Sequence, residues 1–99
     1  MKINLQAIGF SAGESLEKYL TEKLEKLDNF YDQIIAANVF LKEENASEKD
    51  SKIIEILLEV PGDDIVVSKK GESYYEATDL AVDTLKRLII KKKEKMSKK

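Results

Sequence analysis

The chain contains no histidine and no cysteine. It therefore lacks the commonest general base, the best protein nucleophile, and the thiolates that form disulfides or bind metals. The four glycines are isolated at Gly9, Gly13, Gly62 and Gly71, so no glycine-rich loop could cradle a phosphate. These absences argue against an enzyme, and we expect no catalytic residues, no metal site and no cofactor.

Paired carboxylates are the remaining catalytic candidates. Glu43-Glu44 and Asp63-Asp64 both fall in predicted loops of a chain too short to form a deep cleft. Acid catalysis requires carboxyl groups whose environments separate their pKa values, and exposed loops do not provide this. Asp63-Asp64 could hold a cation weakly, but its spacing matches no calcium-binding loop. We interpret both pairs as turn and solubility residues.

Long hydrophobic runs are also missing. No stretch approaches the roughly 18 apolar residues of a membrane-spanning helix, and Met1 to Gln6 lack the apolar run of a signal peptide. The sequence therefore predicts a soluble, cytoplasmic protein, and we attribute the glycosylation-like triplet Asn45-Ala46-Ser47 to chance. The 99 residues are 42% hydrophobic, enough for a single domain over 1–99, with about 96–99 as a frayed basic tail.

Strand patterns occur in four segments, namely residues 2–8, 34–42, 52–60 and 65–71. The third is the clearest, because apolar residues occupy every second position from Ile54 to Val60. Ile53 and Leu57 leave its other face only partly polar. Residues 43–51 are polar or small throughout and predict a mobile loop that buries nothing.

A first amphipathic helix is predicted after a capping box formed by Ser11 and Glu14, with Gly13 as the rival cap. The helix should end near Asp28-Asn29. Its apolar positions recur at helical spacing, at Leu16, Tyr19, Leu20, Leu24 and Leu27.

A second amphipathic helix is predicted from about 74 to about 95, with frayed last turns. Ser73 and Glu76 form its capping box. Its apolar stripe should be broad, comprising Ala77, Leu80, Ala81, Val82, Leu85, Leu88 and Ile89.

The order of these elements is strand, helix, three strands, helix. Pro61-Gly62 suits the centre of a type II turn, so the third and fourth strands should be antiparallel. Because each helix has one apolar face, both can cover the same side of the sheet. We therefore expect an α+β fold, a two-layer βαβββα domain whose four-stranded sheet carries two helices on one face and is open on the other.

Charge is distributed very unevenly along the chain. Residues 84–99 contain eight lysines and arginines and one acidic residue, a net charge of +7, whereas residues 1–83 have a net charge of −9. A cationic helix end could be merely a solvated, fraying terminus that also complements the helix dipole. That explanation covers one or two lysines rather than six basic residues within 86–95, so we favour binding to a polyanion such as RNA.

Several motifs resemble those of one known family, the ribosome hibernation factors, also called ribosome-associated inhibitor A or hibernation promoting factor, and in short forms sigma-54 modulation protein. The longest is the run Lys23-Leu24-Glu25-Lys26-Leu27-Asp28-Asn29-Phe30-Tyr31-Asp32-Gln33-Ile34. The others follow in the family's order, at Val39-Phe40-Leu41-Lys42, Tyr75-Glu76-Ala77-Thr78-Asp79, Asp83 to Arg87, and Lys91-Lys92-Lys93. Together the motifs cover nearly the whole chain.

The resemblance implies a domain close in shape to double-stranded RNA-binding domains, and binding between the head and body of the small ribosomal subunit. Occupancy of the mRNA channel and of the A and P tRNA sites would exclude mRNA and tRNA and protect idle ribosomes. The implied partners are small-subunit rRNA and ribosomal proteins near the decoding centre, without a membrane or a small-molecule substrate. Long family members carry a C-terminal dimerisation domain, so we expect a chain ending at Lys99 not to pair ribosomes through such a domain.

The candidate RNA-binding residues combine the family matches with the other exposed cations. Tyr75 could belong to the core or stack on RNA, and we favour the core. Gln33 and Thr84 stand where the family usually has basic residues, while Ile90 points away from the apolar stripe. The candidate residues are Lys23, Lys26, Lys42, Lys69, Lys70, Tyr75, Lys86, Arg87, Lys91, Lys92, Lys93 and Lys95.

Two other functions remain open from the sequence. The chain could be an RNA-binding domain of another kind, such as a double-stranded RNA-binding domain. It could also be a small protein–protein interaction module that uses the open sheet face or the region of Leu88 and Ile90.

Overall fold

The computed structural model describes residues 1–45, 47 and 49–97. Its elements follow the predicted order, with a short 3₁₀ helix, η1, added after the first α-helix. They are β1 (Lys2–Ala7), α1 (Glu14–Glu25), η1 (Lys26–Asn29), β2 (Ala36–Glu43), β3 (Lys52–Glu59), β4 (Ile65–Gly71) and α2 (Tyr74–Ser97).

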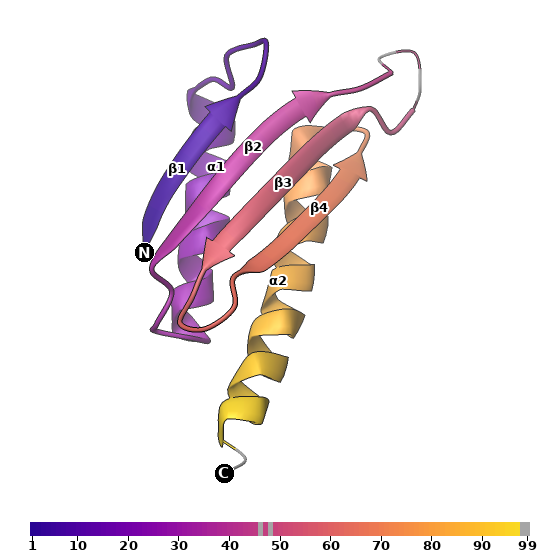
Figure 1. The fold of residues 1–99 in the computed structure, drawn as a ribbon. Coiled ribbons are helices and arrows are strands. Elements are labelled where there is room, and N and C mark those ends of the chain that lie inside the picture. Colours follow the sequence, from indigo (N-terminus) through magenta and orange to yellow (C-terminus); the bar gives the residue numbers. More distant parts are fainter. Residues whose placement is uncertain (46, 48, 98–99) are drawn as a thin grey trace.

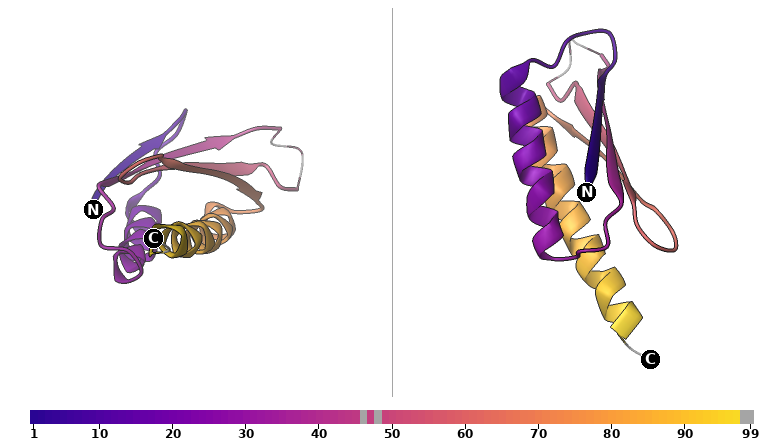
Figure 2. Two further views of the ribbon diagram at one scale, coloured as in Figure 1. Left: turned by 60° about the horizontal axis from the view of Figure 1, so that its bottom comes forward. Right: turned by 90° about the vertical axis from the view of Figure 1, so that its left-hand side faces the viewer.

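The four strands form one sheet in the order β1-β2-β3-β4 (Figure 1). β1 pairs with β2 in parallel, which the intervening α1 crossover allows, and the other two pairs are antiparallel. Both helices lie on the same side of this sheet, and the opposite side is uncovered (Figure 2). The predicted two-layer α+β fold is therefore confirmed.

The core lies between the sheet and the helices. Alternation along β2 and β3 turns every second side chain inward, and Val39, Ile54 and Ile56 are almost fully buried. Leucines at helical spacing on α1 cover these residues, as the sequence predicted. The positive φ of Gly62 (86°) agrees with the turn expected between β3 and β4.

The start of α1 differs from the prediction. Ser11 does not cap the helix; Gly13 occupies the N-cap, and no side-chain hydrogen bond is made there. Gly13 has a φ of 81°, and its carbonyl accepts the Glu17 N–H at 3.2 Å. A backbone in this left-handed region is easy for glycine and costly for serine, so the glycine decides where the helix begins.

The far end of α1 is tighter than expected. The α-helix ends at Glu25, and η1 continues the helical path to Asn29, close to the predicted end. Tightening into a 3₁₀ turn keeps Leu27 in the core, where it is 1% exposed.

The apolar stripe of α2 is narrower than predicted. Ala77, Ala81, Leu85 and Ile89 are completely buried, whereas Leu80 is 45% and Leu88 37% exposed. Figure 2 shows α1 beside α2 on one flank only. The other flank, toward the β4 edge, has no second helix to cover these two leucines.

The segment between β2 and β3 is also less simple than a loop that buries nothing. Glu43 belongs to β2, and Ser51 is only 4% exposed. The Glu43 carboxylate accepts hydrogen bonds from the side chains of Lys52 and Ser51, which lower the pKa of Glu43. Residues 46 and 48 of the predicted loop, and 98–99 of the predicted tail, lie outside the described residues.

Candidate nucleic-acid interface

The second helix begins with the predicted capping box. The Ser73 hydroxyl accepts the Glu76 backbone N–H at 3.1 Å, and the Glu76 carboxylate accepts the backbone N–H of Glu72 at 3.1 Å. The first bond satisfies an amide that the first turn of the helix leaves without a partner, and the second ties the Glu76 side chain to the residue before the N-cap. They anchor the helix where β4 ends.

From this anchor α2 extends well past the sheet. It has 24 residues, two more than predicted, which corresponds to a length of about 36 Å. Figure 1 shows its yellow C-terminal end projecting below the strands and beyond the end of α1. The basic residues of α2 are concentrated in this second half, so the structure holds them on a rigid projection.

The cations of α2 divide between two flanks. Lys86 and Lys93 line shallow hollows on the flank toward α1, together with Phe30. The other flank contains Lys91, Lys92 and Lys95, beside the turn between β3 and β4. Arg87 is exposed between the two flanks. The predicted placement of cations around the free circumference of α2 agrees with this geometry.

Some of these cations already have partners within the protein. Arg87 forms an ion pair with Asp83 one turn earlier, and the Lys92 ammonium donates to the Asp63 carbonyl at 3.4 Å. In the part of the chain that the structure describes, no ion pair is recorded for the remaining members of the cationic set on the helices, Lys26, Lys86, Lys91, Lys93 and Lys95. These five ammonium groups are available to an external anion.

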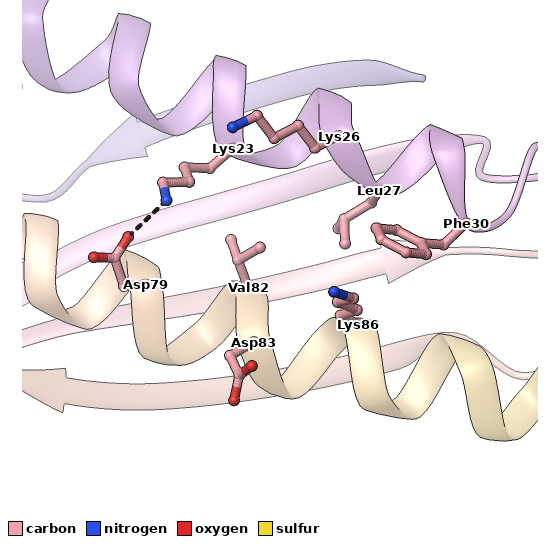
Figure 3. A pocket seen from close by; sticks show the side chains of 8 residues that line it. All are labelled: Lys23, Lys26, Leu27, Phe30, Asp79, Val82, Asp83 and Lys86. Carbon is pink, nitrogen blue, oxygen red and sulfur yellow. Dashed lines mark ion pairs between the residues drawn. The ribbon is translucent and has the colours of Figure 1, made fainter.

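A groove of about 360 Å³ separates α1 from α2 (Figure 3). Lys23 of α1 and Lys86 of α2 reach into it from opposite sides, whereas the side chain of Lys26, in η1, lines it and runs back along α1 toward Lys23. The Lys23 ammonium lies 3.5 Å from the Asp79 carboxylate across the groove. The Lys86 ammonium instead lies 4.5 Å from the centre of the Phe30 ring. Lysines far apart in sequence therefore converge on one surface.

Tyr75 lies beside this groove and not in the core. It is 41% exposed, and its ring contacts the Tyr19 ring edge-on, with centroids 5.0 Å apart. The half-buried aromatic residue at the start of α2 is instead its neighbour Tyr74, which stacks on Phe10. The prediction of a core Tyr75 was wrong, because the first turn of α2 directs Tyr74 toward the sheet and Tyr75 toward α1.

Three cations of the candidate set lie away from the helices. Lys42 and Lys70 point to the open face of the sheet, where they flank Ile53 in neighbouring strands. Ile53 is only 2% exposed although it faces away from the helices. Lys42 also forms a 3.2 Å ion pair with Glu55. Lys69 lies on the helix side of the edge strand β4, so the structure does not unite the whole set on one surface.

The sequence did not single out Phe30 as a site residue. The Phe30-Tyr31 pair offers two adjacent aromatic rings, and periodicity alone does not say which one is buried. In the structure Tyr31 is 6% exposed, whereas Phe30 is only partly buried and lines hollows on the helix side. Ile90 is 37% exposed and lines one of the same hollows, so it is a surface residue.

Neither a metal site nor a membrane-spanning helix is found among the described residues. Within residues 1–45, 47 and 49–97, no group of three or more acidic side chains could hold a metal ion. No helix in that part of the chain is long and apolar enough to cross a membrane.

The fold and this surface together define a class, that of small two-layer α+β domains with a projecting cationic helix. The sequence matches the family model described as "Sigma 54 modulation protein / S30EA ribosomal protein" over residues 3–97. The chain belongs to this family, which confirms the resemblance found in its motifs. Membership also supports the expectation that the chain is not an enzyme.

Curated relatives cover nearly all of the chain. The ribosome hibernation promoting factor of Azotobacter vinelandii is 33% identical over 95 residues, which span 96% of this chain and 85% of the relative. The protein of the same name from Escherichia coli K12 is 31% identical over 96 residues, 97% of each chain.

Solved structures share the fold. A ribosomal subunit interface protein from Coxiella burnetii superposes with a TM-score of 0.85 at 20% identity, over 95% of this chain and 99% of that one. The N-terminal domain of Thermus thermophilus Protein Y gives a TM-score of 0.80 at 26% identity, over 92% of this chain and 98% of that one.

Proposed function

We propose that this protein is a ribosome hibernation factor that binds the small ribosomal subunit across the mRNA channel and the A and P tRNA sites. The observation that supports this most is the cationic half of α2, where no ion pair is recorded among the described residues for Lys86, Lys91, Lys93 and Lys95. Curated relatives named ribosome hibernation promoting factor point to the ribosome as the partner. Such a role would place the protein in the cytoplasm.

The mechanism needs only occupancy. Folded RNA presents ridges of phosphates and 2′-hydroxyls that proteins recognise mainly by shape and charge. A rigid helix about 36 Å long can place Lys86 near one ridge and Lys95 near another, since their Cα atoms are about 13 Å apart along the helix. Each neutralised phosphate releases counterions, which supplies the free energy of binding. The bound protein would then exclude mRNA and tRNA, and no bond is made or broken.

The partner surface need not be confined to the helix layer. Lys42 and Lys70 lie on the opposite face of the sheet, so they would reach a second RNA segment or a ribosomal protein. A domain inserted between the head and the body of the subunit would meet ribosomal components on both of its faces. The open sheet face and the cationic helix would then bind different components.

The test is co-sedimentation of the purified protein with vacant small subunits at increasing salt concentration. We expect binding in dilute buffer, a steep fall in affinity with salt, and loss of binding when mRNA and tRNA already fill the subunit. Absence of binding to vacant subunits in dilute buffer would refute the proposal. Binding that persists beside mRNA and tRNA would favour another RNA-binding mode.

A protein–protein interaction module is the second candidate, because Leu88 and Val66 are both exposed and line one hollow beside β4. The same salt titration distinguishes between the two candidate functions. Association through this apolar surface should change little from low to high salt, because burial of apolar side chains releases no counterions.

A further inference from the structure

Phe30 occupies an unusual position on the helix layer. It directly follows η1, where the chain leaves α1, and it lines three neighbouring hollows on that surface. One hollow is the groove between α1 and α2, and the other two extend toward Lys93 on the projecting helix. One partly buried aromatic ring therefore borders several hollows, while part of it packs against the core.

Lysines line the hollows that this ring borders. The Lys86 ammonium lies 4.5 Å from its centroid, and Figure 3 shows the Lys86 side chain directed toward Phe30. Lys26 lines the groove on the α1 side, and Lys93 lines both of the other hollows. None of these three lysines has an ion pair recorded among the described residues.

Three acidic residues near the ring are already engaged. Asp79 accepts a hydrogen bond from Tyr19 at 2.6 Å and pairs with Lys23. Asp83 pairs with Arg87, and Asp28 lies 3.5 Å from the amino-terminal ammonium group. Asp32 and Glu94 also line the hollows beside Lys93. The positive charge near Phe30 therefore comes from Lys26, Lys86 and Lys93, for which no ion pair is recorded among the described residues.

A partly buried aromatic ring that borders several hollows lined by lysines fits one class of ligand particularly well. Unpaired RNA bases stack on aromatic side chains while nearby lysines neutralise the flanking phosphates. A ligand without charge would leave the lysines unused, and an anion without a flat apolar part would leave the ring unused. The Lys86 contact with the ring is a weak surface interaction that a base can replace.

We infer that Phe30 is a stacking site for an unpaired RNA base, and that Lys26, Lys86 and Lys93 neutralise the phosphates beside that base. The inference rests on the proposed function and deepens it, because it assigns a single-stranded RNA contact to a surface otherwise argued from charge alone. Binding would draw the Lys86 ammonium from the ring face to a phosphate oxygen.

The test compares two probes with the same phosphate spacing, a short oligoadenylate and its abasic counterpart, in low salt. Stacking of one base should make the wild-type protein bind the oligoadenylate at least about five-fold more tightly than the abasic chain. Phe30→Leu keeps an apolar side chain against the core and should remove this preference. Phe30→Tyr keeps an aromatic ring and should retain it.

Phe40→Leu is the matched control. Phe40 is 36% exposed on the opposite face of the sheet, so its replacement makes the same chemical change away from the helices. Equal binding of both probes by the wild-type protein would overturn the inference. Retention of the preference in Phe30→Leu, or an equal loss in Phe40→Leu, would overturn it as well.

Small-subunit binding provides an independent measurement. Phe30→Leu should weaken it at least about five-fold without changing its salt dependence, because no phosphate contact is lost. Weaker subunit binding with unchanged oligoadenylate binding would indicate a ribosomal protein as the partner of Phe30 and would overturn the inference. Failure of the wild-type protein to bind subunits would refute the proposed function, while the oligonucleotide comparison would still decide the role of Phe30.

Discussion

The hydroxyl group of Tyr19 donates a 2.6 Å hydrogen bond to the carboxylate of Asp79 and so joins α1 to the first half of α2. Lys23 pairs with the same carboxylate at 3.5 Å. The contact fixes the relative position of the two helices at one end of the groove. Both side chains come from the helix layer, whose lysines form the proposed RNA-binding surface.

Tyr19→Phe should remove this hydrogen bond and keep the ring contact with Tyr75. Because Asp79 is 52% exposed, we expect the free energy of unfolding to fall by at most about 1 kcal/mol near neutral pH. The hydrogen bond to Asp79, followed by burial, raises the pKa of Tyr19. A group whose pKa is raised on folding stabilises the fold below its unfolded pKa, near 10, and loses this effect as pH rises further.

The stability difference between wild type and Tyr19→Phe should therefore shrink at strongly alkaline pH. Urea unfolding at neutral and alkaline pH measures it. Tyr75→Phe is the control, since no hydrogen bond of the Tyr75 hydroxyl is recorded within the described chain. A difference that grows with alkaline pH would contradict the assigned role of the hydroxyl.

Charge reversal on the projecting helix should weaken binding without unfolding the protein. In Lys91→Glu/Lys93→Glu we expect the affinity for vacant small subunits to fall at least about ten-fold. The slope of log affinity against log salt concentration should decrease by the amount expected for about two lost phosphate contacts. Lys2→Glu/Lys18→Glu makes the same change in net charge on β1 and on the first half of α1. An equal loss of affinity in this control would mean that overall charge, and not the position of the α2 lysines, governs binding.

Ser73→Ala should remove the N-cap of α2. Loss of the bond from the Glu76 N–H to the Ser73 hydroxyl should lower the free energy of unfolding by about 1 kcal/mol, measured by chemical denaturation. Ser11→Ala should change it by less than about 0.5 kcal/mol, because Gly13 and not Ser11 caps the first helix. Equal effects of the two substitutions would show that the capping assignment is wrong.

Leu85→Ala and Leu88→Ala should have different effects on stability, because Leu85 lies in the buried row of α2 and Leu88 lies on its exposed flank. Leu85 is completely buried, so truncation should leave a cavity and cost about 2–5 kcal/mol of stability. Leu88 is 37% exposed, and the same truncation there should cost less than about 1 kcal/mol. Thermal unfolding of both variants measures these losses of stability. Similar losses at the two positions would contradict the finding that Leu88 lies outside the buried stripe of α2.

The order of the elements and most of the core follow from local patterns in the sequence. Alternation in β3 and helical spacing in α1 depend on local geometry, in which side chains repeat every two or about 3.6 residues. The capping box at Ser73 is local in the same way, because its partner is three residues away. The concentration of positive charge in residues 84–99 can likewise be counted without a structure.

Packing between distant parts of the chain selected among several local possibilities. Gly13 replaces Ser11 as a cap because the path from β1 requires a positive φ, and Leu88 is exposed because no second helix covers that flank of α2. The structure also separates Lys42 and Lys70 from the helix lysines and selects Phe30 over Tyr31 for the surface. Each of these outcomes depends on what packs against the residue from a distant part of the chain, and a local sequence pattern does not contain that information.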